Sequence, residues 1–222
     1  MDLIVDSNTF IVFDLDDTLY YEEDYVKSGF EAISNLLKES IKKDVYSELY
    51  ARYKVGKEVF NYILEKYDIS TYQVKDLIYL YRNHFANIKL RKDAELFLKS
   101  LKALNIKIGL LTDGRSITQR NKLAALKIEN QFDLIIISEE FGSEKPSIKN
   151  FEIFEKKFPN RKYYFFGDNI KKDFVSPNKL GWLTFCLIDQ GKNIHSQNIN
   201  VTSEYKPKYF IKSFSELNIK YE

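Results

Sequence analysis

Short apolar runs alternate with amphipathic stretches along most of this 222-residue chain. The runs at residues 9–13, 106–111, 134–137 and 163–166 are rich in β-branched and aromatic side chains, which predicts buried strands. Between them, apolar residues recur at helical spacing, as they do over residues 93–104. Strands that alternate with helices favour right-handed β-α-β crossovers and a parallel sheet. The expected fold class is therefore α/β.

The pattern changes between residues 19 and 90, where no buried strand is evident. Amphipathic helices follow one another there, with apolar stripes in residues 59–67 and 74–85. The segments that begin at Ser28 and at Ser116 have the form of capping boxes, so each predicts the start of a helix. The sequence thus predicts a helical block inserted directly after the first strand.

Polar groups follow the carboxyl ends of the predicted strands. The sets are Asp14 with Asp16, Thr112 with Asp113, Lys145, and Asp168 with Asp173. Ligands of open α/β sheets bind at that edge. A close carboxylate pair is costly to bury unless a cation neutralises it, and Mg²⁺ prefers oxygen ligands. A lone Asp-x-Asp is ordinarily a solvated turn, but the ordered set predicts a site.

These motifs, in this order, resemble those of the haloacid dehalogenase superfamily. Asp14-Leu15-Asp16-Asp17-Thr18, Thr112, Lys145 and Asp168 with Asp173 match its four motifs, and the resemblance spans nearly the whole chain. The stretch from Gly167 to Phe174 is similar to the nucleotidase-like and sugar-phosphatase-like members. The resemblance implies a phosphohydrolase on a Rossmann-like parallel sheet flanked by helices.

The resemblance implies catalytic roles for Asp14, Asp16, Thr112 and Lys145. Asp14 is expected to attack phosphorus and form an aspartyl-phosphate. Asp16 is expected to protonate the leaving oxygen and then to deprotonate the hydrolytic water, which requires a protonation state that its free pKa does not favour. Lys145 is expected to offset charge on Asp14 and on the phosphoryl group.

The same resemblance implies a Mg²⁺ site and a phosphate site. The metal ligands expected are Asp14, Asp16, Asp168 and Asp173, with a backbone carbonyl near Asp16 contributing. Asp173 is expected to support that shell or to orient Lys145. The substrate-binding residues expected are Thr112, Asp113 and Lys145, with the backbone N–H of Asp113 as a phosphate donor.

The helical block resembles the cap that members of the superfamily carry in the first insertion position. Its expected limits are residues 20–89, which leaves residues 1–19 and 90–222 as the α/β core. A cap that closes over the site would exclude water and restrict substrates to a small phosphorylated metabolite. The expected substrate is a sugar phosphate or a nucleoside 5′-monophosphate, and the residues do not decide between them.

Three other functions stay open. A haloacid dehalogenase also uses an aspartate nucleophile, but it needs neither Asp16 nor a metal. A phosphomutase would share all these residues, and a catalytically silent binding module could use the same scaffold.

The second motif reads Thr-Asp-Gly where many relatives have Asn, and Arg115 beside it is expected to be a solvated salt-bridge partner. Tyr20 and Tyr21 stand at the junction with the cap, where they are candidates for shaping the pocket.

Composition and charge bear on the expected partners and on the expected cellular location. The net charge of +2 favours no nucleic-acid partner, and no apolar run is long enough for a membrane span. Cys186, the single cysteine, excludes an internal disulfide and lies in a run typical of a buried strand. No secretory signal is evident, so a cytoplasmic location is expected. The polar tail 191–208 reads as a surface loop and residues 209–211 as an edge strand, while the oligomeric state is unreadable.

Overall fold

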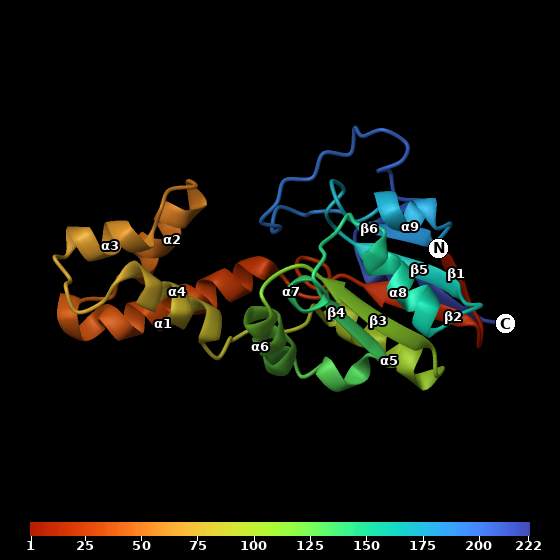
Figure 1. Cartoon of the computed structure of the whole chain (residues 1–222), viewed down its shortest axis with the longest axis horizontal. Helices are drawn as coiled ribbons and strands as arrows, with labels where there is room; N and C mark the ends of the chain where they lie inside the picture. The colour runs from red at the N-terminus through yellow and green to blue at the C-terminus, as the bar shows by residue number, and fades with distance from the viewer.

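A computed structural model describes all residues from 1 to 222. Its centre is a six-stranded, wholly parallel sheet in the order β4-β3-β2-β5-β6-β7 (Figure 1). The strands are β2 (Thr9–Phe13), β3 (Lys107–Thr112), β4 (Leu134–Ile137), β5 (Lys162–Gly167), β6 (Leu183–Leu187) and β7 (Tyr209–Ile211). The predicted α/β class and the predicted edge strand at residues 209–211 are confirmed.

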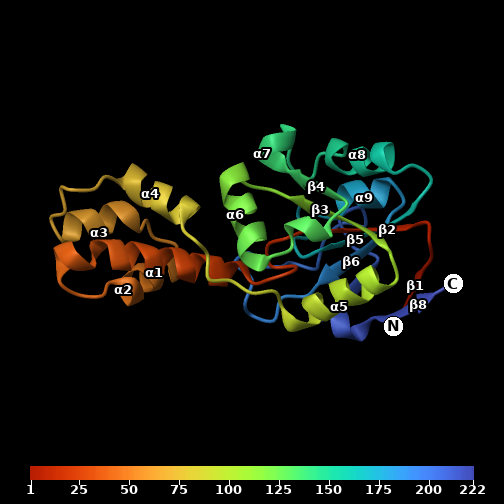
Figure 2. The same ribbon diagram turned by 90° about the horizontal axis from the view of Figure 1, so that it is seen from below.

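Helices cover both faces of this sheet (Figure 2). They are α5 (Lys92–Ala103), α6 (Ser116–Leu126), α7 (Ser138–Phe141), α8 (Lys149–Lys157) and α9 (Val175–Lys179), with short 3-10 turns at Glu129–Gln131 and Phe214–Glu216. Side chains of β2 alternate between two apolar clusters: Ile11 and Phe13 pack with residues of α5, whereas Phe10 and Val12 pack with residues of α8. A sheet that is buried on both faces explains why each strand reads as a continuous apolar run.

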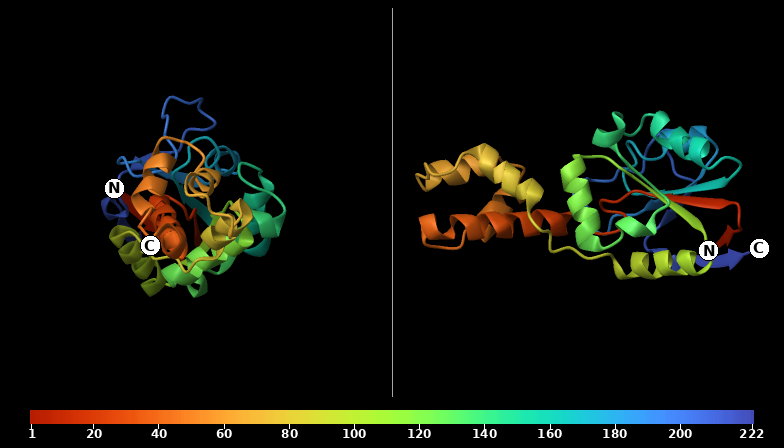
Figure 3. Two further views of the ribbon diagram at one scale, coloured as in Figure 1. Left: turned by 90° about the vertical axis from the view of Figure 1, so that its left-hand side faces the viewer. Right: turned by 60° about the horizontal axis from the view of Figure 1, so that its bottom comes forward.

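Four helices lie to one side of the sheet, beyond the carboxyl ends of its strands (Figure 3). They are α1 (Glu22–Ile41), α2 (Tyr46–Lys54), α3 (Phe60–Lys66) and α4 (Val74–Asn83). Nine buried residues form their own apolar cluster, separate from the clusters of the sheet. The backbone N–H of Arg91 donates to the carbonyl of Leu19 at 2.9 Å, so the chain leaves and rejoins the sheet at one point. The predicted limits of the cap, residues 20–89, stay a prediction.

A small second sheet joins the two ends of the chain, where β1 (Asp2–Val5) pairs in parallel with β8 (Asn218–Tyr221). Leu3 and Val5 of β1 are buried in the same cluster as α5. None of the helices combines the length and the apolar character that a membrane span requires. Cys186 lies fully buried in β6, as its sequence context predicted.

The predicted helix start at Ser116 is confirmed and the one at Ser28 is wrong, and neither serine caps a helix. Ser28 lies inside α1, which begins at Glu22, and its hydroxyl bonds to the His84 ring and accepts from the backbone N–H of Asn87. Ser116 is the first residue of α6, but its hydroxyl donates to Glu140 instead of capping the helix. In both places a tertiary contact replaces the local hydrogen bond that the motif would supply.

Candidate active site

The four polar segments meet at the carboxyl edge of the sheet, beside the central strand β2. The backbone N–H of Asp14 donates to the carbonyl of Phe166 at 2.8 Å, which continues the pairing of β2 with β5 into the site. A polar cavity of about 150 Å³ lies there, lined by Asp14, Asp16, Asp17, Glu22, Thr112, Asp113, Asp168, Asn169, Lys172 and His195. No residue of α2, α3 or α4 lines it.

Lys145 is the cation at the centre of the site. Its Nζ lies 2.6 Å from Oδ1 of Asp14 and 2.8 Å from Oδ1 of Asp173, and only 3% of the residue is exposed. Burial would lower the pKa of Lys145, but the Asp14 and Asp173 carboxylates raise it above its usual value. The structure therefore brings the first, third and fourth motifs into direct contact around one permanent positive charge.

Asp173 also organises the loop that carries Asp168. Its Oδ2 accepts from the backbone N–H groups of Asp168 at 3.1 Å and of Asn169 at 2.9 Å. A Cβ on Gly167 would lie 2.5 Å from that oxygen, so a glycine is needed where β5 ends. Asp173 can thus orient both Lys145 and the turn that presents Asp168.

Three buried carboxylates, those of Asp14, Asp168 and Asp173, place one oxygen each within 4.8 Å of one another. The Asp168 carboxylate receives its hydrogen bond from a neutral donor, the Asn193 amide, at 2.8 Å. One close lysine cannot balance three carboxylates, and the charge excess together with the all-oxygen donor set fits a hard divalent cation. These residues could therefore hold a metal ion.

The pKa values reflect the same excess of negative charge. Burial raises the pKa of Asp14 to about 7, although Lys145 opposes the shift. Burial and the neighbouring Asp173 and Asp14 carboxylates raise the pKa of Asp168 well above its usual value. The protein without metal therefore retains protons among these carboxylates at pH values where a free aspartate would be ionised.

The side chain of Asp16 does not join the group of three carboxylates, and the expected contribution of Asp16 to a metal site stays a prediction. Its Oδ1 accepts from Lys122 Nζ at 2.7 Å and from the Tyr20 hydroxyl, and its Oδ2 accepts from Gln119 at 2.9 Å. These donors hold the carboxylate on the α6 side of the cavity. Burial would raise the pKa of Asp16, but the charge and hydrogen bond of Lys122, helped by Tyr20 and Gln119, lower it.

Thr112 ends β3 with its side chain buried beside the cavity. The Asp113 carboxylate accepts from the backbone N–H of Lys145 at 3.0 Å and pairs with Lys172 Nζ at 2.8 Å. The aspartate that departs from the usual motif thus has two partners of its own. It ties the Thr112 loop to the loop that carries Lys145.

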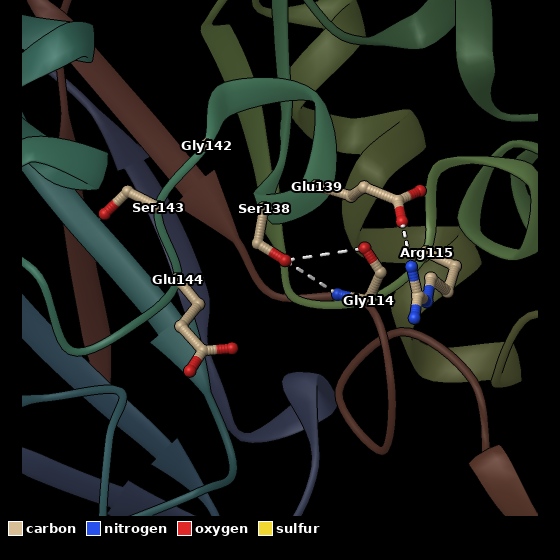
Figure 4. A pocket seen from close by; sticks show the side chains of 7 residues that line it. All are labelled: Gly114, Arg115, Ser138, Glu139, Gly142, Ser143 and Glu144. Carbon is tan, nitrogen blue, oxygen red and sulfur yellow. Dashed lines mark hydrogen bonds and ion pairs between the residues drawn. The ribbon is translucent and has the colours of Figure 1, made fainter.

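A larger and more open hollow, of about 480 Å³, adjoins the Thr112 loop (Figure 4). Ser138 accepts from the backbone N–H of Gly114 at 2.9 Å, and Arg115 pairs with Glu139 at 2.6 Å. The Arg115 side chain is 63% exposed, which confirms its interpretation as a solvated salt-bridge partner. These contacts pin the loop after β3 to α7, and the charges that line the hollow at Arg115 and Glu139 already satisfy each other.

Sequence reasoning missed the contribution of the polar segment after Gly191. Asn193 donates to the Asp168 carboxylate and Gln197 donates to the Asp168 carbonyl at 2.7 Å.

Asp17 adopts a left-handed conformation with φ 55°, and its carboxylate accepts from the backbone N–H groups of Glu22 and Ile194, each at 2.9 Å. The surface loop therefore contacts both the acidic group and Asp17, whose carboxylate also accepts from the first residue of α1.

We expect Mg²⁺ to stabilise the protein more strongly as the pH rises. The ion requires ionised carboxylates, and the pKa of Asp14 is raised to about 7, so below that pH binding must displace a proton and weakens by up to about tenfold per pH unit. The rise in Tm on adding Mg²⁺ over chelator should accordingly grow between about pH 5.5 and pH 8.

The matched variants are Asp168→Asn, which should lose the Mg²⁺-dependent rise in Tm, and Asp133→Asn, which should keep it. Asp133 precedes β4 at the opposite edge of the sheet and pairs there with Lys107. An equal rise in Tm at both pH values, or a full rise in Asp168→Asn, would contradict this assignment of the metal site.

Comparison with known proteins finds a matching family model and several proteins of similar sequence. Residues 11–186 match the family model described as haloacid dehalogenase-like hydrolase. A glyceraldehyde 3-phosphate phosphatase of Methanocaldococcus jannaschii is 30% identical, over 93% of this chain and 94% of the relative. The pyrimidine 5′-nucleotidase YjjG of Escherichia coli is 34% identical over a shorter region, 37% of this chain and 38% of the relative.

The fold is shared more widely. The crystal structure of a 2-haloacid dehalogenase from Pseudomonas syringae superposes with a TM-score of 0.62 over 94% of this chain and 95% of that chain, at 16% identity. At that identity the likeness shows the fold alone, and the chemistry must be argued from the site.

Proposed function

Because this chain belongs to the haloacid dehalogenase-like hydrolase family, we propose that it hydrolyses a small phosphomonoester through an aspartyl-phosphate on Asp14. The observation that carries the proposal is the separation of two carboxylates at one cavity. Asp14 lies against Lys145 among the acidic residues, whereas Asp16 is held on the other side by Lys122 and Gln119. Two carboxylates in such different surroundings suit a nucleophile and a separate proton carrier.

Each residue then has a distinct task. Asp14 attacks phosphorus, and Lys145 and Thr112, with the backbone N–H of Asp113, stabilise the charge on the phosphoryl oxygens. Asp16 protonates the leaving alkoxide and afterwards accepts a proton from the hydrolytic water. Asp16 is ionised in the free protein, since Lys122 lowers its pKa, and the negative charge of an arriving phosphate raises that pKa toward the value an acid requires.

Asp14 and Asp168 would hold Mg²⁺, with Asp173 supporting them. When bound, Mg²⁺ neutralises the charge that these carboxylates and the phosphoryl group bring together. The residues fit that ion because they supply oxygen donors and an uncompensated negative charge.

A sugar phosphate of few carbons is the substrate class that we favour over a nucleotide. The cavity of about 150 Å³ is smaller than the roughly 300–1,000 Å³ typical of pockets for larger ligands. The relative that aligns over nearly its whole length is named a glyceraldehyde 3-phosphate phosphatase, whereas the nucleotidase aligns over 38% of its length. A retained Asp16 also favours phosphoester over carbon–halogen cleavage, because a halide leaves without a proton.

The test is release of inorganic phosphate from glyceraldehyde 3-phosphate, larger sugar phosphates and pyrimidine 5′-monophosphates, each with Mg²⁺ and with chelator. We expect Mg²⁺-dependent turnover, with the highest kcat/KM for the three-carbon substrate. Halide release from a 2-haloacid, or an absence of phosphate release from every ester, would overturn the proposal. Transfer of phosphate to a second sugar hydroxyl instead of water would identify a phosphomutase.

A further inference from the structure

Two buried polar side chains on one face of α6 contact Asp16, and their own role in the proposed reaction can be inferred from their partners. Gln119 and Lys122 stand three residues apart, so both point to the same side of the helix. Gln119 is 1% exposed and Lys122 is 3% exposed. Burying an amide and an ammonium group is costly unless each finds partners, so their partners indicate what they do.

Lys122 is directed at Asp16. Its Nζ lies 2.7 Å from Oδ1 of Asp16, against 3.7 Å from the carboxylate of Glu22, the first residue of α1. The ring of Tyr25 lies 4.8 Å from the same ammonium group. The site therefore contains one buried lysine for each of its two functional carboxylates, Lys145 for Asp14 and Lys122 for Asp16.

Gln119 joins Asp16 to Thr112. Its side-chain N–H₂ donates to Oδ2 of Asp16 at 2.9 Å and to Oγ1 of Thr112 at 2.5 Å. The opposite amide orientation would place a carbonyl oxygen against a carboxylate, so the network itself selects this one. Because the Thr112 hydroxyl accepts from Gln119, its single proton stays free to be donated toward the cavity.

We infer that Gln119 and Lys122 are positioning residues: they fix the Asp16 carboxylate for proton transfer and leave the Thr112 hydroxyl as a donor to phosphate. This inference rests on the proposed function. An aspartate side chain held at both oxygens cannot rotate away from the leaving oxygen, and proton transfer requires hydrogen-bond reach. Both residues act through others and contact no reacting atom themselves.

Lys122→Met provides a test that depends on the leaving group. Cleavage of an alkyl phosphate such as glycerol 3-phosphate needs a proton on the departing oxygen, whereas nitrophenolate leaves p-nitrophenyl phosphate without one. We expect kcat/KM to fall by about 10²-fold or more for the alkyl ester, and by less than about tenfold for the aryl ester. Lys122→Arg should recover part of the loss on the alkyl ester.

The matched control is Lys99→Met, which removes an exposed lysine of α5 that pairs with Glu95 at 2.6 Å. It should leave both kcat/KM values unchanged. Gln119→Met should lower kcat/KM for both esters, because it disturbs Thr112 as well as Asp16. The ratio of the two substrates does not depend on the amount of folded enzyme, so partial unfolding of a variant cannot imitate the expected result.

The outcomes separate the two proposals. A wild-type protein that hydrolyses neither these two esters nor glyceraldehyde 3-phosphate overturns the proposed function. A wild-type protein that hydrolyses both, with Lys122→Met losing the same factor on each, overturns the positioning role and leaves the phosphatase intact. A selective loss on the alkyl ester supports the positioning role.

Discussion

Replacement of Asp14 by Asn is expected to abolish phosphate release, with a fall in kcat of at least about 10⁴-fold. The amide is nearly the same size, but it is a poor nucleophile and cannot carry the phosphoryl group as an acyl phosphate does. Asp14 is 6% exposed and lies 2.6 Å from Lys145, so no neighbouring carboxylate can take its place without a rearrangement. The measurement is phosphate release with saturating Mg²⁺, beside the Tm of both proteins.

Asp24→Asn is the matched control, since Asp24 lies in the first turn of α1 with 44% of its side chain exposed and Lys27 at 4.0 Å. It should retain full activity. Substantial turnover by a folded Asp14→Asn protein would show that another group attacks phosphorus. It would also remove the argument for an aspartyl-phosphate.

Lys145→Met is expected to lower the free energy of unfolding by about 3–5 kcal/mol in chelator. The change leaves Asp14 and Asp173 buried without the cation that contacts both of them, at 2.6 and 2.8 Å. Added Mg²⁺ should restore part of the loss, because it supplies positive charge to the same carboxylates. Denaturant unfolding with and without Mg²⁺ measures both effects, and activity should fall as well.

Lys162→Met is the control that separates the effect of burial on stability from the effect of ion pairing. Lys162 lies 2.6 Å from Asp6, a distance like that of Lys145 from Asp14, but its side chain is 63% exposed. Exposed ion pairs contribute little to stability, so the free energy of unfolding of this variant should be close to that of the wild type. If both lysine variants lost the same stability, the buried cation would not be what holds the acidic group together. Lys145→Arg keeps the charge, and serves if Lys145→Met does not fold.

Most of the sheet could be predicted because its strands are buried on both faces. The runs before Asp14, Thr112 and Asp168 carry apolar side chains at nearly every position, and the polar residue that follows marks the strand end. The pairing of β1 with β8 could not be predicted in this way. Four-residue strands from opposite ends of the chain carry no local signal of each other.

The residues of the candidate site that belong to the sequence motifs could be predicted. Asp14, Lys145, Asp168 and Asp173 do converge, because each follows a strand whose carboxyl end lies at the same edge. Lys122 is different, since a lysine inside an amphipathic helix ordinarily faces solvent. Only the packing of α6 against the sheet shows that its ammonium group reaches Asp16.

The hydrogen bond from Arg91 to Leu19 has a consequence for how such a protein can evolve. Residues 20–90 leave the sheet and return to it at a single junction, so a longer, shorter or unrelated insert would meet the same two ends. Descendants of one ancestral sheet could then exchange inserts, and with them their range of substrates, while inheriting Asp14, Lys145 and Asp168 unchanged. Divergence of the insert at that junction would change which substrate is hydrolysed and would preserve the residues that hydrolyse it.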